Sequence, residues 1–174
     1  LDGLRPGLVA QPIEVTKGLA IGRTKLLDHG DHAPLGLGLE VTRHVDLADR
    51  LAQGRCVLGI GAGHSGTRNL GMERSTMAEM DRGIRHIKTL LSGEPATLDG
   101  GTAHIPWATG APKVFLAGSG PKTLALAGAV ADGALVNYGI TAETMAQSEA
   151  RVRDGAAAAG RDPNEIENWQ VASL

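Results

Sequence analysis

Short apolar runs alternate with amphipathic segments along the chain from residue 55 onwards. The run at 56–60 (CVLGI) is unbroken and leads into further glycines, as is typical of a strand that is buried on both faces. Runs at 113–117 (KVFLA) and 134–136 (ALV) have the same character, and another begins at 169–174 (WQVASL). Strands of this kind, separated by helices, predict an α/β fold with a parallel sheet.

Three segments between these runs have the period of a helix. Residues 75–91 place an apolar side chain at every third or fourth position, which predicts a helix with one buried face. The helix predicted at 121–131 starts with proline, whose missing N–H does no harm in the first turn. The third, at 141–159, is rich in alanine and is closed by Gly160.

The polar positions of the helix at 75–91 predict its solvent face. His86 lies beside the apolar stripe rather than on it, so we expect it to be exposed. The rest of the solvent face is expected to consist of four charged residues, namely Asp81, Arg82, Arg85 and Lys88.

The first 54 residues give a weaker pattern. Prolines and glycines interrupt 1–34, and only 35–41 (LGLGLEV) looks like a strand. Residues 44–53 then predict a short helix that leads into the strand at 56–60.

Composition and charge exclude several classes of function. A net charge of −2 and the lack of any basic tract give no electrostatic reason to expect a nucleic-acid partner. No apolar run approaches the ~20 residues that a membrane span needs, and no signal peptide is recognisable, so we expect a cytoplasmic protein. Cys56 is the only cysteine, which excludes an intrachain disulfide and a thiolate metal site; we expect a buried, inert thiol.

A group of carboxylates and imidazoles near the start of the chain has side chains suitable for a metal ion. Its members lie within five residues of one another, with no distant partner: Asp28, His29, Asp31 and His32. A solvated polar turn explains them better, so no metal site is predicted.

The stretch Gly61-x-Gly63-x-x-Gly66 has the spacing of the dinucleotide-binding fingerprint. In that unit the helix begins within the fingerprint, whereas here the helical pattern starts only near Ser75. A glycine-rich strand-to-helix turn without a ligand is therefore the better interpretation. An NAD-dependent dehydrogenase remains a possible function, in addition to the two functions considered below.

A second glycine motif, Gly118-Ser119-Gly120, stands directly between a predicted strand and the helix that starts at Pro121. Glycine lets the backbone approach a ligand closely, and a helix N-terminus has free N–H groups. This arrangement suits a single phosphate, with the Ser119 hydroxyl as an added donor. The alternative is an ordinary turn between strand and helix.

Four stretches of the chain together resemble one family: GRCVLGIGAGHSGTRNLG, the helix that ends in LLSGE, IPWATGAPKVFLAGSGPKTLALAGAVADGALVN and DGAAAAGRDPNEI. They are similar to the bacterial luciferase-like oxidoreductases, and within them to the branch with the F420-dependent methylenetetrahydromethanopterin reductases. The resemblance covers about 35–174 and matches 1–34 poorly. It implies one domain over 1–174, a TIM barrel of the (β/α)8 type that is incomplete at this length.

The resemblance also implies a cofactor site at the carboxyl ends of the strands. The ring of FMN or F420 would lie beside the first glycine turn, with a hydrogen bond from Thr67, and the phosphate would lie on the second. His64 would be the catalytic residue, as a proton donor or by orienting the substrate. The cofactor-binding residues implied are Gly61, Ala62, Gly63, Thr67, Gly118, Ser119, Gly120 and Pro121.

Two further features are implied for the first part of the chain. The segment 35–41 is similar to the third strand of the family, which would put a strained peptide bond near Glu40–Val41, under the ring. Asp28-His29 is similar to an Asp-His pair at the end of the second strand of some F420 enzymes.

The function implied is an oxidoreductase that acts on a small organic substrate. With reduced FMN the reaction would be monooxygenation, and with F420 it would be hydride transfer. The resemblance of 113–166 to the reductase branch favours F420. The alternative is a non-catalytic flavin-binding or assembly protein derived from a truncated barrel. A short barrel leaves strand edges and apolar surface open, so we expect a homodimer.

Overall fold

A five-stranded parallel sheet forms the centre of the molecule. The computed structural model describes residues 13–20, 33–63, 74–98, 100–108 and 112–171. The strands are β1 (Ile13–Ala20), β2 (Cys56–Gly61), β5 (Lys113–Gly118), β6 (Gly133–Val136) and β7 (Glu167–Gln170), and they lie side by side in that order. Each of these five strands pairs in parallel with its neighbour in this order.

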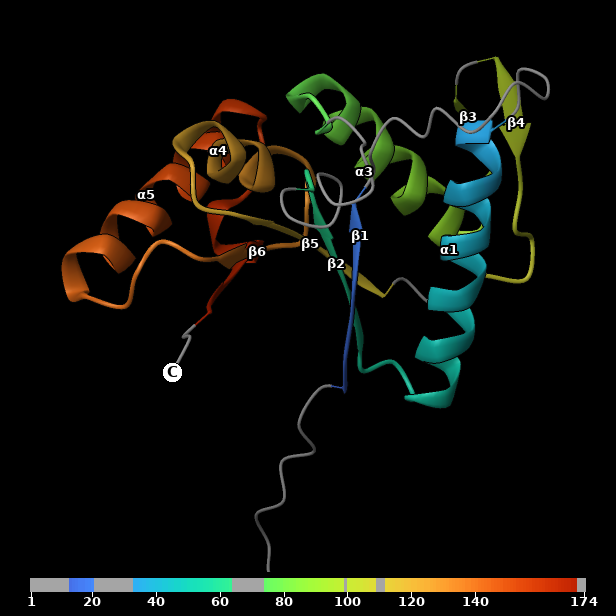
Figure 1. Cartoon of the computed structure of the whole chain (residues 1–174), viewed down its shortest axis with the longest axis horizontal. Coiled ribbons are helices and arrows are strands. Elements are labelled where there is room, and N and C mark those ends of the chain that lie inside the picture. The colour runs from blue at the N-terminus through green and yellow to red at the C-terminus, as the bar shows by residue number, and fades with distance from the viewer. Residues whose placement is uncertain (1–12, 21–32, 64–73, 99, 109–111, 172–174) are drawn as a thin grey trace, which may run out of the picture.

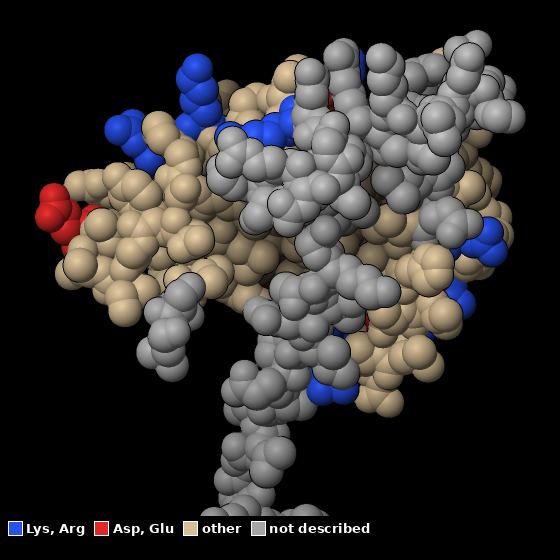
Figure 2. Space-filling view, viewed as in Figure 1, with Lys and Arg blue, Asp and Glu red and all other residues tan. Residues whose placement is uncertain are grey.

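Helices join the neighbouring strands and cover the sheet in an arc (Figure 1). They are α1 (Ala33–Leu51), α3 (Met77–Leu91), α4 (Pro121–Val130) and α5 (Ala142–Ala158); a short 3-10 turn, Pro163–Glu165, precedes β7. The strand order never reverses, so the sheet has no switch point between two winding directions. This single winding, with every helix on the same side, is that of a barrel segment. On the face shown in Figure 2, charged side chains are scattered rather than gathered.

The sheet has two different faces because successive strand residues point to opposite sides. Towards the helices, alternate residues of β2, β5 and β6 are buried in one apolar cluster with α3, α4 and α5; they are Leu58, Ile60, Val114, Leu116, Ala134 and Val136. On the opposite face the ring of Phe115 meets Trp169 edge to face, with centroids 4.8 Å apart. Gly133 makes this possible, since a Cβ there would lie 2.5 Å from the Phe115 ring.

The predictions for 56–60, 75–91, 113–117, 121–131, 134–136 and 141–159 are confirmed, with small shifts of their ends. The capping box of Thr76 and Glu79 starts α3, and Thr141 caps α5. Gly160 ends α5 with φ +71°, as expected for its place after the helix. A short hairpin between α3 and β5 was not predicted; its strands are β3 (Ala96–Leu98) and β4 (Gly101–Ala103).

The strand predicted at 35–41 is wrong, because the whole segment belongs to α1. Its alternating leucine and glycine imitate the period of a strand, but the buried positions that follow have the three-to-four spacing of a helix: Thr42, Val45, Asp46, Asp49 and Ala52. Glu40–Val41 therefore lies inside a helix, and the described residues contain no cis peptide bond. The strand that precedes this helix is β1, which the sequence did not reveal.

The prediction that His86 is exposed is also wrong, since only 5% of it is accessible. The buried side of α3 is wide because the helix packs against α1 and β3 as well as against α4. Lys88 leaves the predicted solvent face too. Its ammonium group lies 2.5 Å from Asp132 and 3.4 Å from the carbonyl oxygen of Val130.

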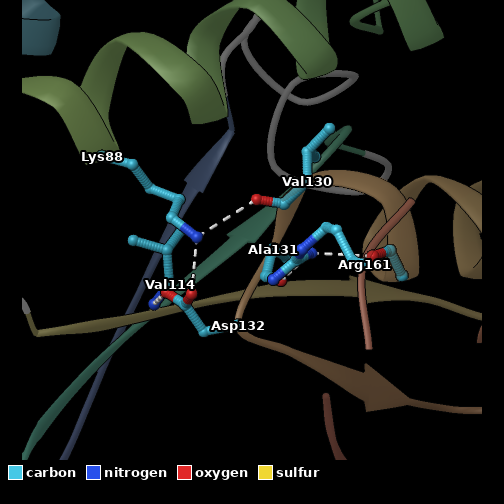
Figure 3. A network of polar contacts seen from close by, with 7 residues as sticks. Lys88, Val114, Val130, Ala131, Asp132 and Arg161 are labelled. Carbon is cyan, nitrogen blue, oxygen red and sulfur yellow. Dashed lines mark hydrogen bonds and ion pairs between the residues drawn. The ribbon is translucent and has the colours of Figure 1, made fainter. Parts of the chain in front are cut away.

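Asp132 joins three strands and a helix at the amino edge of the sheet (Figure 3). Its Oδ2 accepts from Val114 N–H at 2.9 Å, and its own N–H donates to Val114 O at 2.8 Å. Its carbonyl oxygen accepts from Glu167 N–H at 3.1 Å, and Lys88 pairs with Oδ1. Beside it, Arg161 donates to the carbonyl oxygens of Gly128 and Ala131, both at 2.7 Å.

Asp132→Ala should lower the free energy of unfolding by about 2 kcal/mol, because it leaves Val114 N–H without its side-chain acceptor. Asp132→Asn keeps an acceptor oxygen and loses only the partly exposed ion pair with Lys88, so it should cost less than about 1 kcal/mol. Urea denaturation of both variants checks this. Equal losses would contradict the importance given to the hydrogen bond.

Candidate functional site

The two glycine turns lie next to each other at the carboxyl edge of the sheet. Gly61 pairs with Ala117 in the register of β2 and β5, so both strands end at the same level. Ala62 and Gly63 then follow β2, and Ser119 and Gly120 follow β5. This edge is where α/β proteins bind their ligands, because the loops from parallel strands meet there.

The second turn is shaped by Gly118 and Gly120. A Cβ at Gly118 would lie 2.4 Å from Cγ2 of Thr123, so only glycine fits there without a shift. Thr123 in turn reaches α3, with its hydroxyl 3.9 Å from the sulfur of Met77. At Gly120 the nearest atom to an added Cβ is 4.0 Å away, which leaves the approach to the helix open.

In the part of the chain that the structure describes, no side chain caps the positive end of α4. Thr76 and Thr141 cap α3 and α5, but Gly120 caps α4 without a side-chain hydrogen bond. Its first turn contains the exposed Lys122 and no acidic residue. A lysine is unfavourable at this end of a helix unless an anion lies beside it. Backbone N–H groups, the Ser119 hydroxyl and Lys122 together fit a phosphate.

The first turn presents backbone and small side chains. Ala62 O accepts from Ser75 N–H at 3.0 Å, which ties this turn to the start of α3. Gly63 has φ +75°, a conformation that favours glycine. Beside it, Gly61 and Ala117 bring little bulk to the face away from the helices, so a flat ring system has room to approach.

Asn137 is a candidate that the sequence did not single out. Its N–H donates to the carbonyl oxygen of Gly118 at 3.2 Å, and it is exposed directly after β6. An amide can both donate and accept a hydrogen bond. The sequence contained one sign of this: Asn137 is a polar residue directly after the strand β6, and β6 pairs with β5, which leads into the second glycine turn.

Several predicted residues lie outside the described part of the chain, namely His64, Gly66, Thr67, Asp28, His29, Asp31 and His32. Within the described ranges, no three His, Cys, Asp or Glu side chains come together in a way that could hold a metal ion. None of the described helices is long and apolar enough to cross a membrane.

Cys56 is buried at the start of β2, as predicted, with 3% of its surface accessible. Burial raises the pKa of its thiol, and the nearby Asp49 carboxylate raises it further, against a smaller opposing effect of Val57 N–H. Asp49 is there for a structural reason, because its Oδ1 accepts from Cys56 N–H at 3.0 Å. A protonated thiol in this position has no role in the site.

The family model for luciferase-like monooxygenases matches residues 41–173. The chain belongs to this family. A curated relative, the 5,10-methylenetetrahydromethanopterin reductase of Methanolobus tindarius, is 31% identical over 126 residues. That match covers 68% of this chain and 38% of the relative, so the chain spans well under half of the relative's length.

Two solved structures share the fold. The coenzyme F420 dependent tetrahydromethanopterin reductase from Methanopyrus kandleri matches with a TM-score of 0.67 and 21% identity, over 78% of this chain and 46% of that one. A riboflavin lyase, solved with modified FMN and riboflavin, matches with a TM-score of 0.59 and 16% identity, over 84% and 38%. The described sheet is therefore part of a TIM-type barrel, which confirms the fold class.

The Cys56 thiol should react with Ellman's reagent at least ~100-fold more slowly in the folded chain than in guanidinium, because the strand must open first. Since the pKa is raised on folding, the unfolded chain loses the thiol proton first as the pH rises. Stability should therefore fall above the ordinary thiol pKa, and Cys56→Ala should remove that fall. The absorbance of the Ellman product measures the reaction rate, and urea denaturation at several pH values measures the stability. A fast reaction in the folded chain would contradict the burial of Cys56.

Proposed function

We propose that the chain binds the cofactor of an oxidoreductase that uses reduced FMN or F420 on a small organic substrate. The observation that carries this proposal is the N-terminus of α4. Its first turn has no acidic residue, Gly118-Ser119-Gly120 precedes it, and it lies next to the turn after β2. The family and the names of the relatives support the same class of chemistry.

Each turn has its own part in this proposal. The N-terminus of α4, which begins with Pro121, binds the cofactor phosphate through backbone N–H groups, with Ser119 as a further donor. Gly61, Ala62 and Gly63 let the ring lie against backbone, and Thr67 donates a hydrogen bond to it. The bound cofactor supplies hydride transfer or oxygen activation, and the protein supplies orientation and exclusion of water.

The choice of cofactor depends on the phosphate. FMN has a terminal phosphate monoester, whereas F420 has a phosphate diester with fewer free oxygens. The name of the solved tetrahydromethanopterin reductase favours F420, and that of the riboflavin lyase favours FMN. Resemblance to the reductase branch over 113–166 makes F420 the first choice.

The test is a fluorescence titration of the chain with FMN and, separately, with F420, with NADP as the control ligand. Ser119→Asp places a carboxylate at the phosphate and should weaken binding by about 10- to 100-fold. Ala150→Asp adds the same charge to the exposed middle of α5 and should leave the affinity unchanged. Ser119→Ala removes only one hydroxyl donor and should weaken binding by less than about tenfold.

Each result of this titration has one meaning. Binding of either cofactor that depends on Ser119 supports the proposal and selects the cofactor. If neither binds, or if Ser119→Asp has no effect, the phosphate site is wrong. Binding of NADP alone would instead favour the dehydrogenase. Binding without turnover of any substrate would favour a non-catalytic flavin-binding protein.

We also propose that His64 is the proton donor or orients the substrate, since it follows the first glycine turn. His64→Gln should leave cofactor affinity within about twofold and lower the rate with bound reduced cofactor by about 100-fold or more. Stopped-flow absorbance measures this rate, with His104→Gln as the control; an unchanged rate would remove His64 from the mechanism.

A further inference from the structure

Exposed apolar side chains gather at the carboxyl ends of β6 and β7. Of the seven large apolar residues that are exposed in the described chain, four lie there: Tyr138 (44% accessible), Ile140 (64%), Met145 (42%) and Val171 (43%). We call these four residues the apolar rim. Side chains of this kind cost free energy in water, so a cluster of them marks a contact site.

The apolar rim continues directly from the candidate cofactor site. Tyr138 follows Asn137, whose N–H donates to Gly118 O at 3.2 Å, so the loop lies against the second glycine turn. Val171 N–H donates to Val136 O at 2.8 Å, which extends the pairing of β6 and β7 to the same edge. The cofactor turns lie over β2 and β5, and the apolar rim lies over the next two strands.

The loop after β6, which carries Tyr138 and Ile140 of the apolar rim, has a defined conformation. Thr141 caps α5 by accepting from Thr144 N–H at 3.2 Å, and the two hydroxyl groups lie 3.0 Å apart. Gly139 has φ +103° and packs against Thr144, where an added Cβ would lie 3.3 Å from its hydroxyl oxygen. The apolar side chains are thus presented by a braced turn rather than by a loose one.

The chemistry of this surface indicates what it binds. Residues 133–142 contain no charged side chain, and Asn137, Tyr138 and Thr141 are their uncharged polar groups. The next residue along the chain is the exposed Glu143 in the first turn of α5, and its carboxylate accepts a hydrogen bond from the Gln147 side chain on the same helix. The other exposed apolar residues, Leu47 and Leu51 on α1 together with Trp107, have Arg43 and Arg50 among them and lie away from the glycine turns.

We propose that the apolar rim binds the organic substrate of the oxidoreductase and selects an uncharged, largely apolar molecule. This inference rests on the proposed function, since it takes the cofactor to lie on the neighbouring glycine turns. Asn137 supplies one hydrogen bond at the inner end of the apolar rim, and Tyr138 and Ile140 supply apolar contact. A charged substrate would lose its hydration here without gaining a partner.

Two dyes with the same ring system test the proposal on the intact chain: uncharged N-phenylnaphthylamine and the anionic anilinonaphthalenesulfonate. The uncharged dye should bind saturably at one site and more tightly than the anion. Ile140→Glu should weaken its binding by about tenfold or more, since it replaces an apolar contact by a charge. Leu51→Glu changes an even more exposed residue (78% accessible) on α1 and should have no effect.

Three outcomes would overturn the proposal: tighter binding of the anion, equal effects of the two variants, or no effect of Ile140→Glu. A fourth would be a dimer that Ile140→Glu, and not Leu51→Glu, converts to a monomer, with dye affinity unchanged. Light scattering would detect it and would make the apolar rim an interface between copies. FMN and F420 titrations of both variants should match the unmodified chain. If no cofactor binds at all, the proposed function fails, while the dye result still decides whether the apolar rim binds apolar molecules.

Discussion

The loops that follow β5, β6 and β7 at the candidate site depend on how Asp132 holds the other end of these three strands. Its backbone and carboxylate together bind Val114, Glu167 and Lys88, so β5, β6 and β7 start at one level. Parallel strands have no turn between them to set their register, so the buried face of each strand and contacts such as those of Asp132 set it. With the starts aligned, the carboxyl ends of these strands meet, and the loop after β6 reaches Gly118.

The two edges of the sheet differ in how well their polar groups are satisfied. At the amino edge, side chains close the backbone: Asp132 binds strand N–H groups, and Arg161 binds the last carbonyl oxygens of α4. At the carboxyl edge, the N-cap of α4 is a glycine without a side-chain hydrogen bond, and an exposed lysine lies in the first turn. Under the proposed function, stability and binding are thus separated along the strands, as is usual in barrels.

Along the carboxyl edge, the surface over β2 and β5 is mainly backbone and small residues, whereas the surface over β6 and β7 consists of larger side chains. Over β2 and β5 the turns are built from glycine, alanine and serine, and they suit a cofactor that is recognised through its phosphate and its flat ring. Over β6 and β7 the apolar rim, with Tyr138 and Ile140, gives uncharged contact. Under the proposed function the cofactor is held mainly by backbone, and the substrate is selected by side chains, which can change without disturbing the sheet.

The sequence by itself determined the elements whose signals are local: the buried strands, the capped helices and the turn at 118–120. It misplaced a strand at 35–41 because alternating leucine and glycine have the period of a strand, whereas the segment continues into the amphipathic helix α1, which packs against α3. It also predicted that His86 is exposed, although the residue is buried. The periodicity of α3 shows one buried stripe and does not show that α1 and β3 cover a further side of the helix. That the two glycine turns and Asn137 lie together was decided by the tertiary structure, because strand register joins residues far apart in the chain.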